Sequence, residues 1–404
     1  MKTINKGFRK LGRDYIFEEI GKKAEEKENR GEELIRVSTG DAVFPLGKTV
    51  TEALVSAAAE TGTDEGFRGY PPVSGYGFLK CAIRRKYLGL RVEVKENEIY
   101  VGNGTKSDIS GFFDLFGSAS VIVPDPGYPV YVDSCAISGL KAELLKGSFE
   151  NGFLPAPCDL KTPVRKAVII LCSPANPTGE AYPEEVLRSW VLFAIRTRSV
   201  ILFDAAYEAY IKDSTIPRSI YAVEGASLCA VEFGSFSKSA GFTGLRCSYT
   251  IIPENLRFGG ENLGKLWARR QSSKFNGVPY IVQKAAEAAL SPEGRKESEA
   301  VVGIYGNNAF ELRKAFLNRG IRCCGGVNSP YVWVACPKNA TSARTADDLL
   351  NRAGVVVTPG TGFGKNGEGF IRLSGFLKPE KLPELLGRLN SFYDRSCGFI
   401  GEDL

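Results

Sequence analysis

The sequence predicts an α/β fold, with a mostly parallel sheet in a large domain and a smaller α+β domain after it. Short apolar runs alternate with longer amphipathic stretches between residues 95 and 255, which is typical of parallel strands covered by helices on both faces. A separate set of apolar runs follows residue 279. The length of 404 residues also favours two domains, since a single core stops growing at roughly 250–300 residues.

Six apolar runs rich in β-branched residues are expected to form the strands of the large domain. They are EIYVG (98–102), ASVIVP (119–124), KAVIILC (166–172), VILFD (200–204), CAVEFG (229–234) and CSYTII (247–252). A crossover helix is expected over Glu184–Ser199, with Pro183 suited to its first turn. Open α/β sheets bind ligands beyond the carboxyl ends of their strands, so polar residues just after these runs are candidates for a site.

The C-terminal part has its own predicted elements. After Pro279 the run IVQKAAEAAL predicts a helix, the runs YVWVAC, GVVVTP and GFIRLS predict strands, and a closing helix is expected near Glu380–Tyr393. The glycine-rich segment 358–369 is interpreted as a loop over an active site; a phosphate-binding loop is the weaker alternative, because its spacing fits neither the dinucleotide nor the P-loop pattern. We expect three units: an N-terminal segment at 1–45 that contributes to the small domain and the active site, a large domain at 46–285, and a small domain at 286–404.

Charge and hydropathy exclude several classes of protein. The net charge of +6 comes from 52 basic and 46 acidic residues dispersed along the chain, so no stripe of positive charge predicts binding to nucleic acid. No apolar run approaches the roughly 20 residues that span a bilayer, and the first thirty residues mix acids with bases, unlike a signal or transit peptide. We expect a cytoplasmic protein that binds neither nucleic acid nor membrane.

Cysteine and histidine usage narrows the chemistry. The ten cysteines include no CxxC pair, and we expect them to be buried small hydrophobes rather than redox centres or metal ligands, so no metal site is predicted. The chain has no histidine, which excludes Ser-His-Asp triads, Cys-His dyads, HExxH zinc sites and histidine general bases. Proton transfer near neutral pH then needs another group, and a lysine with a lowered pKa is the natural candidate.

Lys238 is that candidate. It ends the sequence SFSK (235–238), directly after the run CAVEFG. A lysine at the mouth of a sheet can be desolvated, which lowers its pKa and makes it a nucleophile able to form a Schiff base. The hydroxyls of Ser235 and Ser237 and the guanidinium of Arg246 supply donors for a phosphate ester. Taken alone, the same residues also fit a solvated surface lysine in a polar loop.

Asp204 and Tyr207 suggest which phosphate ester it is. A Schiff-base lysine beside phosphate donors indicates pyridoxal 5′-phosphate, whose ring accepts electrons best when its nitrogen is protonated. Asp204 ends the run VILFD and would hold that proton, and Tyr207 could donate to the ring oxygen O3′. The alternative for Asp204 is a helix N-cap, since Asp commonly opens the helix after a strand.

Two turn segments offer further cofactor contacts. Asn176 lies in CSPANPTG (172–179), where Asn-Pro and Pro-Thr-Gly force a turn that can present the amide to O3′; a plain turn asparagine is the alternative. The glycines of GNGTK (102–106) let backbone N–H groups at a helix start approach a phosphate, a pattern that is weak on its own.

Tyr128 and Arg372 complete the set of candidates. Tyr128, in PDPGYPVYVD, is placed to lie over one face of a planar ring, with core packing as the alternative. Arg372, in GFIRLS, sits on an apolar strand where an unpaired guanidinium would be costly. Bidentate capture of a substrate α-carboxylate explains it, and a buried ion pair is the alternative.

The order and spacing of these residues resemble the fold-type I, class I and II aminotransferases. The resemblance rests on Asn176 in NPTG, Asp204-x-x-Tyr207, Ser235-x-Ser237-Lys238, Arg246 and Arg372. The segments 232–253, 267–290, 328–337 and 360–376, with GDAVFPLG (40–47), NGTKSD and DPGYPVYVD, are similar to one family within that group, the LL-diaminopimelate aminotransferases. The resemblance implies a PLP-dependent transferase fold of type I with a seven-stranded, mostly parallel sheet, and Lys238 as both Schiff-base residue and proton shuttle.

The resemblance also implies a homodimer with active sites shared between its subunits. Catalytic roles fall to Lys238, Asp204 and Tyr128. Cofactor contacts fall to Tyr70, Thr105, Lys106, Tyr128, Asn176, Asp204, Tyr207, Ser235, Ser237, Lys238 and Arg246. Substrate contacts fall to Tyr15, Gly40, Lys106, Tyr128, Asn176, Asn276 and Arg372, with Tyr70 and Asn276 reaching in from the partner subunit.

The reaction implied is the exchange between LL-2,6-diaminopimelate plus 2-oxoglutarate and tetrahydrodipicolinate plus glutamate, which feeds lysine and peptidoglycan precursors. Many members of the resembled family carry an acid in the loop after Tyr70 that can meet the distal ammonium of diaminopimelate, whereas Pro71–Gly75 has none. The alternatives are an aminotransferase of broader range, or one for aspartate or aromatic amino acids. A non-catalytic PLP-binding regulator is disfavoured, because the N-terminal thirty residues are too few and too acidic for a DNA-binding domain.

Overall fold

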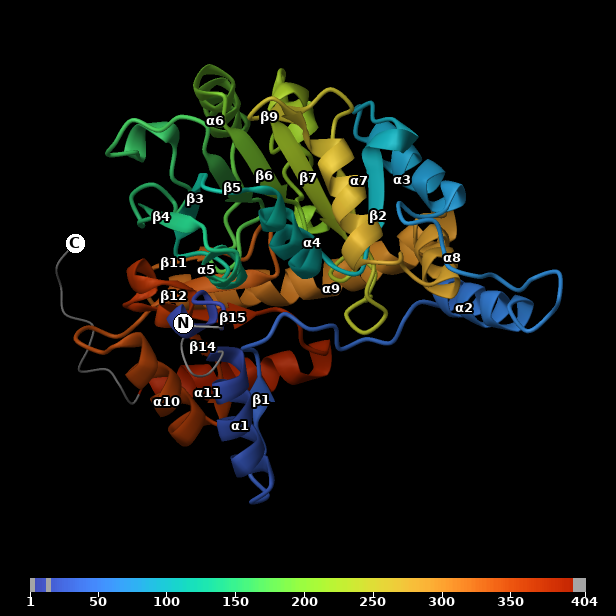
Figure 1. The fold of residues 1–404 in the computed structure, drawn as a ribbon. Coiled ribbons are helices and arrows are strands. Elements are labelled where there is room, and N and C mark those ends of the chain that lie inside the picture. Colours follow the sequence, from blue (N-terminus) through green and yellow to red (C-terminus); the bar gives the residue numbers. More distant parts are fainter. Residues whose placement is uncertain (1–3, 12–15, 395–404) are drawn as a thin grey trace.

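The computed structural model describes residues 4–11 and 16–394. Figure 1 shows a large sheet flanked by helices and, next to it, a smaller group of strands and helices built mainly from the C-terminal part of the chain. The long helix α9 (Pro292–Leu317) runs between the two groups. Within the described residues, no helix combines the length and apolarity needed to cross a membrane.

The large sheet has seven strands in the order β2-β8-β7-β6-β5-β3-β4. They are β2 (Ile99–Gly102), β3 (Ser120–Asp125), β4 (Lys141–Lys146), β5 (Val168–Cys172), β6 (Val200–Asp204), β7 (Ala230–Ser235) and β8 (Ser248–Ile251). The neighbours from β7 to β4 pair in parallel. β8 is antiparallel to both β7 and β2, so it alone runs against the other strands of this sheet.

Helices cover both faces of this sheet, as the unbroken apolar runs require. The helices of this part are α2 (Lys48–Glu60), α3 (Gly77–Gly89), α4 (Thr105–Phe112), α5 (Val130–Ile137), α6 (Glu184–Thr197), α7 (Leu263–Lys274) and α8 (Tyr280–Ala289). Along β6, Leu202 packs in a core with residues of α4, α5 and α7, whereas Ile201 and Phe203 pack in a second core with residues of α6. Alternate residues of one strand therefore serve opposite layers.

The smaller group is built around a four-stranded antiparallel sheet in the order β11-β12-β15-β14. Its elements are α1 (Ile16–Glu28), β1 (Ile35–Arg36), β11 (Cys323–Gly325), β12 (Tyr331–Ala335), α10 (Ser342–Ala353), β13 (Val355–Val356), β14 (Thr358–Pro359), β15 (Phe370–Ser374) and α11 (Leu382–Asp394). The N-terminal strand β1 pairs in parallel with β13. The start of the chain thus packs on its C-terminal part.

The expected α/β class is confirmed, and all six expected strands of the large sheet are present, with ends within two residues of the expected ones. The crossover helix ends at Thr197, and Pro183 is its N-cap residue. β4 was not predicted from the sequence. Its residues KAELLK mix charged and apolar side chains, because this strand lies at the edge of the sheet. The domain boundaries at residues 45 and 285 stay a prediction.

We expect Trp190→Ala to lower the free energy of unfolding by about 3–5 kcal/mol, the usual cost of deleting a buried aromatic side chain. Trp190 is fully buried in the core under α6, and its indole N–H donates to the Pro155 carbonyl at 2.9 Å. The measurement is urea unfolding followed by far-ultraviolet circular dichroism. Leu192→Ala on the same helix is the matched control, because Leu192 is 53% exposed; equal losses in both variants would contradict the assignment of the core.

Candidate active site

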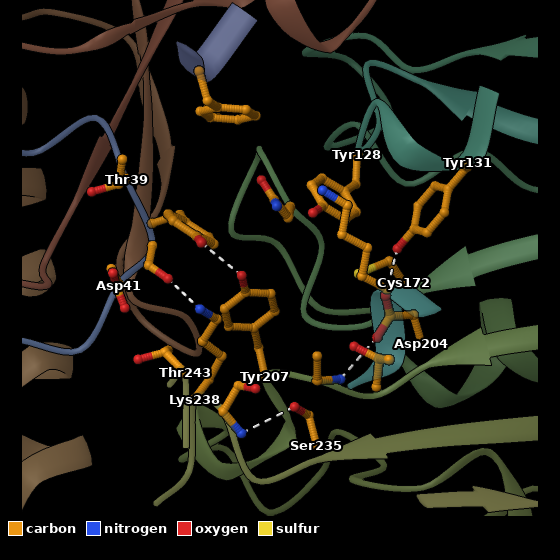
Figure 2. A pocket seen from close by; sticks show the side chains of 18 of the residues that line it. Thr39, Asp41, Tyr128, Tyr131, Cys172, Asp204, Tyr207, Ser235, Lys238 and Thr243 are labelled. Carbon is orange, nitrogen blue, oxygen red and sulfur yellow. Dashed lines mark hydrogen bonds between the residues drawn. The ribbon is translucent and has the colours of Figure 1, made fainter. Parts of the chain in front are cut away.

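A cavity of about 340 Å³ lies at the carboxyl ends of β5, β6 and β7. Figure 2 shows side chains from both groups of elements around it. Twelve of the residues expected in the site line it: Gly40, Thr105, Lys106, Tyr128, Asn176, Asp204, Tyr207, Ser235, Ser237, Lys238, Arg246 and Arg372. Segments that are up to 332 residues apart in the chain, from Gly40 to Arg372, therefore meet at one place.

The strand register explains why these residues meet. Cys172, Asp204 and Phe233 are aligned on β5, β6 and β7. Parallel strands that end level with one another place the residues that follow at the same edge of the sheet. The loops carrying Asn176 and Lys238 leave the sheet at this edge, so their side chains face the same space.

Lys238 lies in the loop that follows β7. Its Nζ donates a hydrogen bond to the Gly40 carbonyl, and its own carbonyl accepts one from Tyr210 Oη at 3.0 Å (Figure 2 shows the first). Burial lowers the pKa of Lys238 to about 8; Asp41 opposes the shift, and the positive charges of Arg246 and Arg372 add to it. With this pKa roughly one fifth of the amine is neutral at pH 7.4, far more than for an ordinary lysine, and the neutral form is the nucleophile. The surface-lysine alternative is wrong.

Asp204 is buried at the end of β6, with 5% of its surface exposed. One carboxylate oxygen accepts a hydrogen bond from Tyr131 Oη at 2.7 Å and the other from the Ala206 N–H at 3.1 Å (Figure 2). Burial raises the pKa of Asp204, and both hydrogen bonds oppose that rise. The bond to Ala206 is a short turn contact, and the chain continues into the 3₁₀ turn η5 (Glu208–Tyr210). Asp204 therefore does not cap an α-helix.

One end of the cavity holds donors suited to a phosphate. Arg246 Nη1 donates to the Thr243 carbonyl at 3.1 Å and lies 3.4 Å from Ser237 Oγ. Ser235 and the start of α4 at Thr105 line the same cavity. Within residues 4–11 and 16–394, no carboxylate lies within 4 Å of Arg246. The donor set fits a bound phosphate ester.

Gly104 is required by this arrangement. Its φ is +130°, and a Cβ there would lie 2.1 Å from Arg246 Nη2. Its N–H donates to Ser248 Oγ at 2.7 Å, and Ser248 in turn donates to the buried carboxyl of Asp108. Burial raises the pKa of Asp108 to about 7, against the hydrogen bond from Ser248. Gly104 therefore allows the guanidinium of Arg246 to approach the backbone closely, a role that was not predicted from the sequence.

Arg372, on β15, also lines the cavity and has only 1% of its surface exposed. Nη1 donates to Asn176 Oδ1 at 2.7 Å, and Nη2 donates to the Ser38 carbonyl. The rings of Tyr331 and Phe363 lie 4.4 and 4.7 Å from the guanidinium carbon.

Among the described residues, no carboxylate pairs with the charge of Arg372. In the described part of the chain no carboxylate lies within 4 Å of it, and its Nε has no hydrogen-bond partner. The alternative of a buried ion pair is therefore wrong. A buried cation without an acid is costly unless a ligand supplies the negative charge. Since Asn176 uses its carbonyl oxygen on Arg372, its amide N–H₂ group remains as a donor for a ligand.

Eight lining residues were not predicted from the sequence, and three of them lie beside Asp204 or Tyr207. Tyr131 binds Asp204, Tyr331 Oη lies 2.6 Å from Tyr207 Oη, and Cys172 is aligned with Asp204 on the neighbouring strand. Tyr131 follows Tyr128 by three residues, a spacing that places side chains on one side of a helix and that could have identified it. The run YVWV did not identify Tyr331 in this way. It predicts a strand, but the pattern of a strand does not show which of its two faces lies against a ligand.

Two expected site residues lie elsewhere, and a third is not among the described residues. Tyr15 falls outside the described residues. Tyr70 and Asn276 line a separate surface hollow, and 87% of the surface of Tyr70 is exposed. The chain after α2, which carries Tyr70, extends away from the body of the molecule in Figure 1. In the glycine-rich segment, Phe363 reaches Arg372, whereas no residue of 358–369 lines the cavity itself.

Comparison with known proteins gives a consistent result. Residues 32–389 match the model of the family described as aminotransferase class I and II. An LL-diaminopimelate aminotransferase of Prochlorococcus marinus is 43% identical over 399 residues, which covers 93% of this chain and 96% of that protein. The enzyme of the same name from Lawsonia intracellularis is 43% identical over 408 residues, with 96% and 98% covered.

Solved structures agree with the fold. The L,L-diaminopimelate aminotransferase of Chlamydomonas reinhardtii superposes with a TM-score of 0.90 at 35% identity, covering 97% of this chain and 98% of that one. A Thermus thermophilus aspartate aminotransferase variant superposes with a TM-score of 0.86 at 24% identity, over 97% of this chain and all of that one. The second likeness, at such low identity, shows the fold alone.

We expect Lys238 in the cofactor-free protein to react with a trace of acetic anhydride as a lysine of pKa about 8. Because burial destabilises its charged form, its acetylation rate should rise through pH 8, whereas an ordinary lysine rises near pH 10.4. Peptide mass spectrometry after pulses at several pH values gives the titration curve. The exposed Lys95, whose pKa the neighbouring Glu254 raises, is the internal control; identical curves for the two lysines would contradict the prediction.

Proposed function

The chain belongs to the class I and II aminotransferase family, and we propose that it exchanges an amino group between LL-2,6-diaminopimelate plus 2-oxoglutarate and tetrahydrodipicolinate plus glutamate. It is an enzyme of a family that depends on pyridoxal phosphate. The proposal rests on the contents of one cavity. It is lined by Lys238, whose pKa is lowered, by the buried carboxylate of Asp204, and by the buried Arg372, which has no carboxylate partner among the described residues. Relatives named for this reaction match nearly the whole chain.

The cavity contains residues suited to the phosphate of pyridoxal phosphate and residues suited to its ring. Ser235, Ser237, Arg246 and the start of α4 would hold the phosphate. Asp204 would hold the proton on the ring nitrogen, and Tyr131 orients its carboxylate for this. When bound, the cofactor supplies an aldehyde that takes up the amino group and a ring that accepts electrons from the substrate α-carbon.

The chain's own groups then move and hold the protons. Lys238 would carry the cofactor covalently and, once displaced by the amino donor, its neutral Nζ would remove the proton from the substrate α-carbon. The chain has no histidine that could do this instead. Tyr207 and the amide of Asn176 would donate hydrogen bonds to the ring oxygen, and Tyr128 would cover one face of the ring.

We expect the protein to bind the substrate through the negatively charged carboxylates of the substrate. Arg372 would bind the α-carboxylate in place of the missing protein counterion. Gly40 and Lys106 lie on the wall of the same cavity and would contact the remainder of the substrate. Tyr15 is assigned to the substrate by family resemblance alone.

We also propose that the enzyme is a homodimer with shared active sites. Tyr70 and Asn276 lie together in a surface hollow outside the cavity, and the segment carrying Tyr70 extends from the body of the molecule (Figure 1). A tyrosine so exposed gains a partner if it reaches the phosphate site of a second subunit. The division into segments 1–45, 46–285 and 286–404 is part of the same proposal.

A cytoplasmic location is proposed on the state of the cysteines. Nine of the ten cysteines lie in the described residues, where they form no disulfide. Disulfides are rare in proteins of the reducing cytosol.

One specific observation favours a second candidate, an aminotransferase of broader range. The loop Pro71–Gly75 after Tyr70 contains no acid that could pair with a distal ammonium group. A site without that contact would discriminate less between diaminopimelate and other amino acids with a free α-carboxylate.

The direct test is a substrate panel. Purified enzyme with pyridoxal phosphate and 2-oxoglutarate should form glutamate from LL-diaminopimelate with a kcat/KM at least about tenfold above that for aspartate, phenylalanine or lysine, a difference worth about 1.4 kcal/mol in transition-state binding. Lys238→Ala should lose the visible absorbance of the lysine-linked cofactor and about 10²–10⁴ of the rate. Lys141→Ala, at an exposed position, is the control. Equal rates across the panel would favour the broad-range candidate, and multiple turnover by the Lys238 variant would refute the catalytic assignment.

Shared active sites can be tested by mixing inactive subunits. We expect Lys238→Ala subunits and Tyr70→Ala subunits each to form homodimers of low activity. A hybrid dimer contains one intact site, since wild-type Lys238 of one chain meets wild-type Tyr70 of the other. We expect activity to rise severalfold after co-refolding or co-expression of the two variants, measured per purified hybrid. No rise would place Tyr70 and Lys238 in the same subunit's site.

A further inference from the structure

A partly buried ion cluster lies next to the turn that carries Tyr207: the side chains of Glu208 and Lys86 are 8% and 18% exposed, and that of Arg218 is 39% exposed. Glu208 directly follows Tyr207 in the chain. Lys86 Nζ, near the end of α3, donates to Glu208 Oε1 at 2.7 Å and to Tyr249 Oη at 2.8 Å. Arg218 Nε donates to Glu208 Oε2 and to the Glu208 carbonyl, both at 3.1 Å. One carboxylate thus receives two cations from separate segments.

The cluster is costly enough to need an explanation. Taking charges out of water costs several kcal/mol per ion, and a buried ion pair repays this only with good geometry and further hydrogen bonds. Although burial opposes it, the pKa of Glu208 stays below its ordinary value because Lys86 and Arg218 stabilise the carboxylate. Polar atoms around the cluster are satisfied as well, since Tyr87 donates to Glu232 of β7, which also accepts from Ser219 Oγ at 2.7 Å. Well-packed apolar residues would give similar stability more simply.

The turn that Glu208 anchors holds the reacting groups. Residues 204–210 include Asp204 and Tyr207, both of which line the active-site cavity, and Tyr210, whose Oη bonds the Lys238 carbonyl at 3.0 Å. The turn has little regular structure of its own, because only η5 (Glu208–Tyr210) follows the strand. A displacement of Glu208 would therefore move Tyr207 directly and Lys238 through its contact with Tyr210.

Tyr249 extends the cluster to the next strand. It is aligned with Gly234 on β7, and a Cβ at Gly234 would lie 2.1 Å from the Tyr249 ring. Gly234 directly precedes Ser235, which is expected to contact the phosphate. The Lys86 ammonium, bonded to Tyr249 and to Glu208, thus joins the turn of Tyr207 to the strand that leads to Lys238.

We propose that Glu208, clamped by Lys86 and Arg218, is a positioning residue for the transamination site, which fixes the turn 204–210 so that Tyr207 and Lys238 keep their places relative to the cofactor. The inference rests on the proposed function, because it assigns the clamp a role in that reaction. None of the three residues touches the active-site cavity, so each acts through the turn.

The experiment compares four variants of the holoenzyme. Lys86→Met removes one cation, Lys86→Arg keeps the charge and the bond to Glu208, and Lys86→Met/Glu208→Gln removes both charges and leaves no uncompensated carboxylate. Lys95→Met is the matched control, because it breaks the Lys95–Glu254 pair of 2.8 Å in the same part of the molecule with side chains 62% and 49% exposed.

Three readouts separate positioning from simple loss of stability. The first is kcat against KM; the second is the dissociation constant for pyridoxal phosphate added to the cofactor-free protein; the third is the pKa of the lysine-linked cofactor, read from its pH-dependent absorbance. Small displacements of reacting groups can cost about 10²-fold in rate. We expect the double variant to lose about tenfold or more in kcat with KM within about twofold, to bind the cofactor more weakly, and to shift the absorbance pKa.

The controls decide the outcome. Lys86→Arg should restore kcat to within about threefold of wild type, since the hydrogen bond to Glu208 is kept, and Lys95→Met should match wild type. If the folded double variant has wild-type kcat, cofactor affinity and absorbance pKa, the positioning role is wrong, whatever its melting temperature. If wild-type protein shows neither the lysine-linked absorbance nor transamination, the proposed function fails first, which is a different result.

Discussion

The register of three parallel strands is the constraint on which the site depends. β5 and β6 end level with one another at Cys172 and Asp204, and the aligned Phe233 lies two residues before the end of β7. Along β6 the side chains alternate between two helical layers. A slip of one residue would turn Asp204 toward α6 and place Phe203 at the cavity, because the side-chain period of a strand is two. The strands are buried on both faces, and the cost of exposing their apolar side chains keeps that register fixed.

The cavity built on this register has an imbalance of charge. Four cationic residues, Lys106, Lys238, Arg246 and Arg372, line it, against two carboxylates, Asp41 and Asp204. Neither of the two arginines has a carboxylate within 4 Å in the described part of the chain. A phosphate bound by Arg246 and a substrate carboxylate bound by Arg372 would neutralise the charges of both arginines. Much of the affinity for ligands thus originates in protein charges that the folded chain leaves uncompensated.

Much of this arrangement could be predicted from the sequence, because strands and their polar ends leave local patterns. The apolar runs located six strands of the large sheet, and Lys238, Asp204 and Asn176 were found because each follows such a run. Contacts between distant segments leave no such pattern. Tyr331 is paired with Tyr207 over 124 positions of sequence, and the close approach of Arg246 to Gly104 is visible only in three dimensions.

The interior of the protein, rather than its surface, responds to pH in the neutral range. Histidine ordinarily titrates between about pH 5 and 8, and this chain has none. Among the described residues, burial raises the pKa values of Asp108 and Glu232 to about 7 and lowers that of Lys238 to about 8. Exposed Asp, Glu, Lys and Arg side chains keep their charges there. As the pH rises through 7 these interior groups lose protons and the positive charge of the protein falls, so the electrostatic attraction of anionic substrates should weaken.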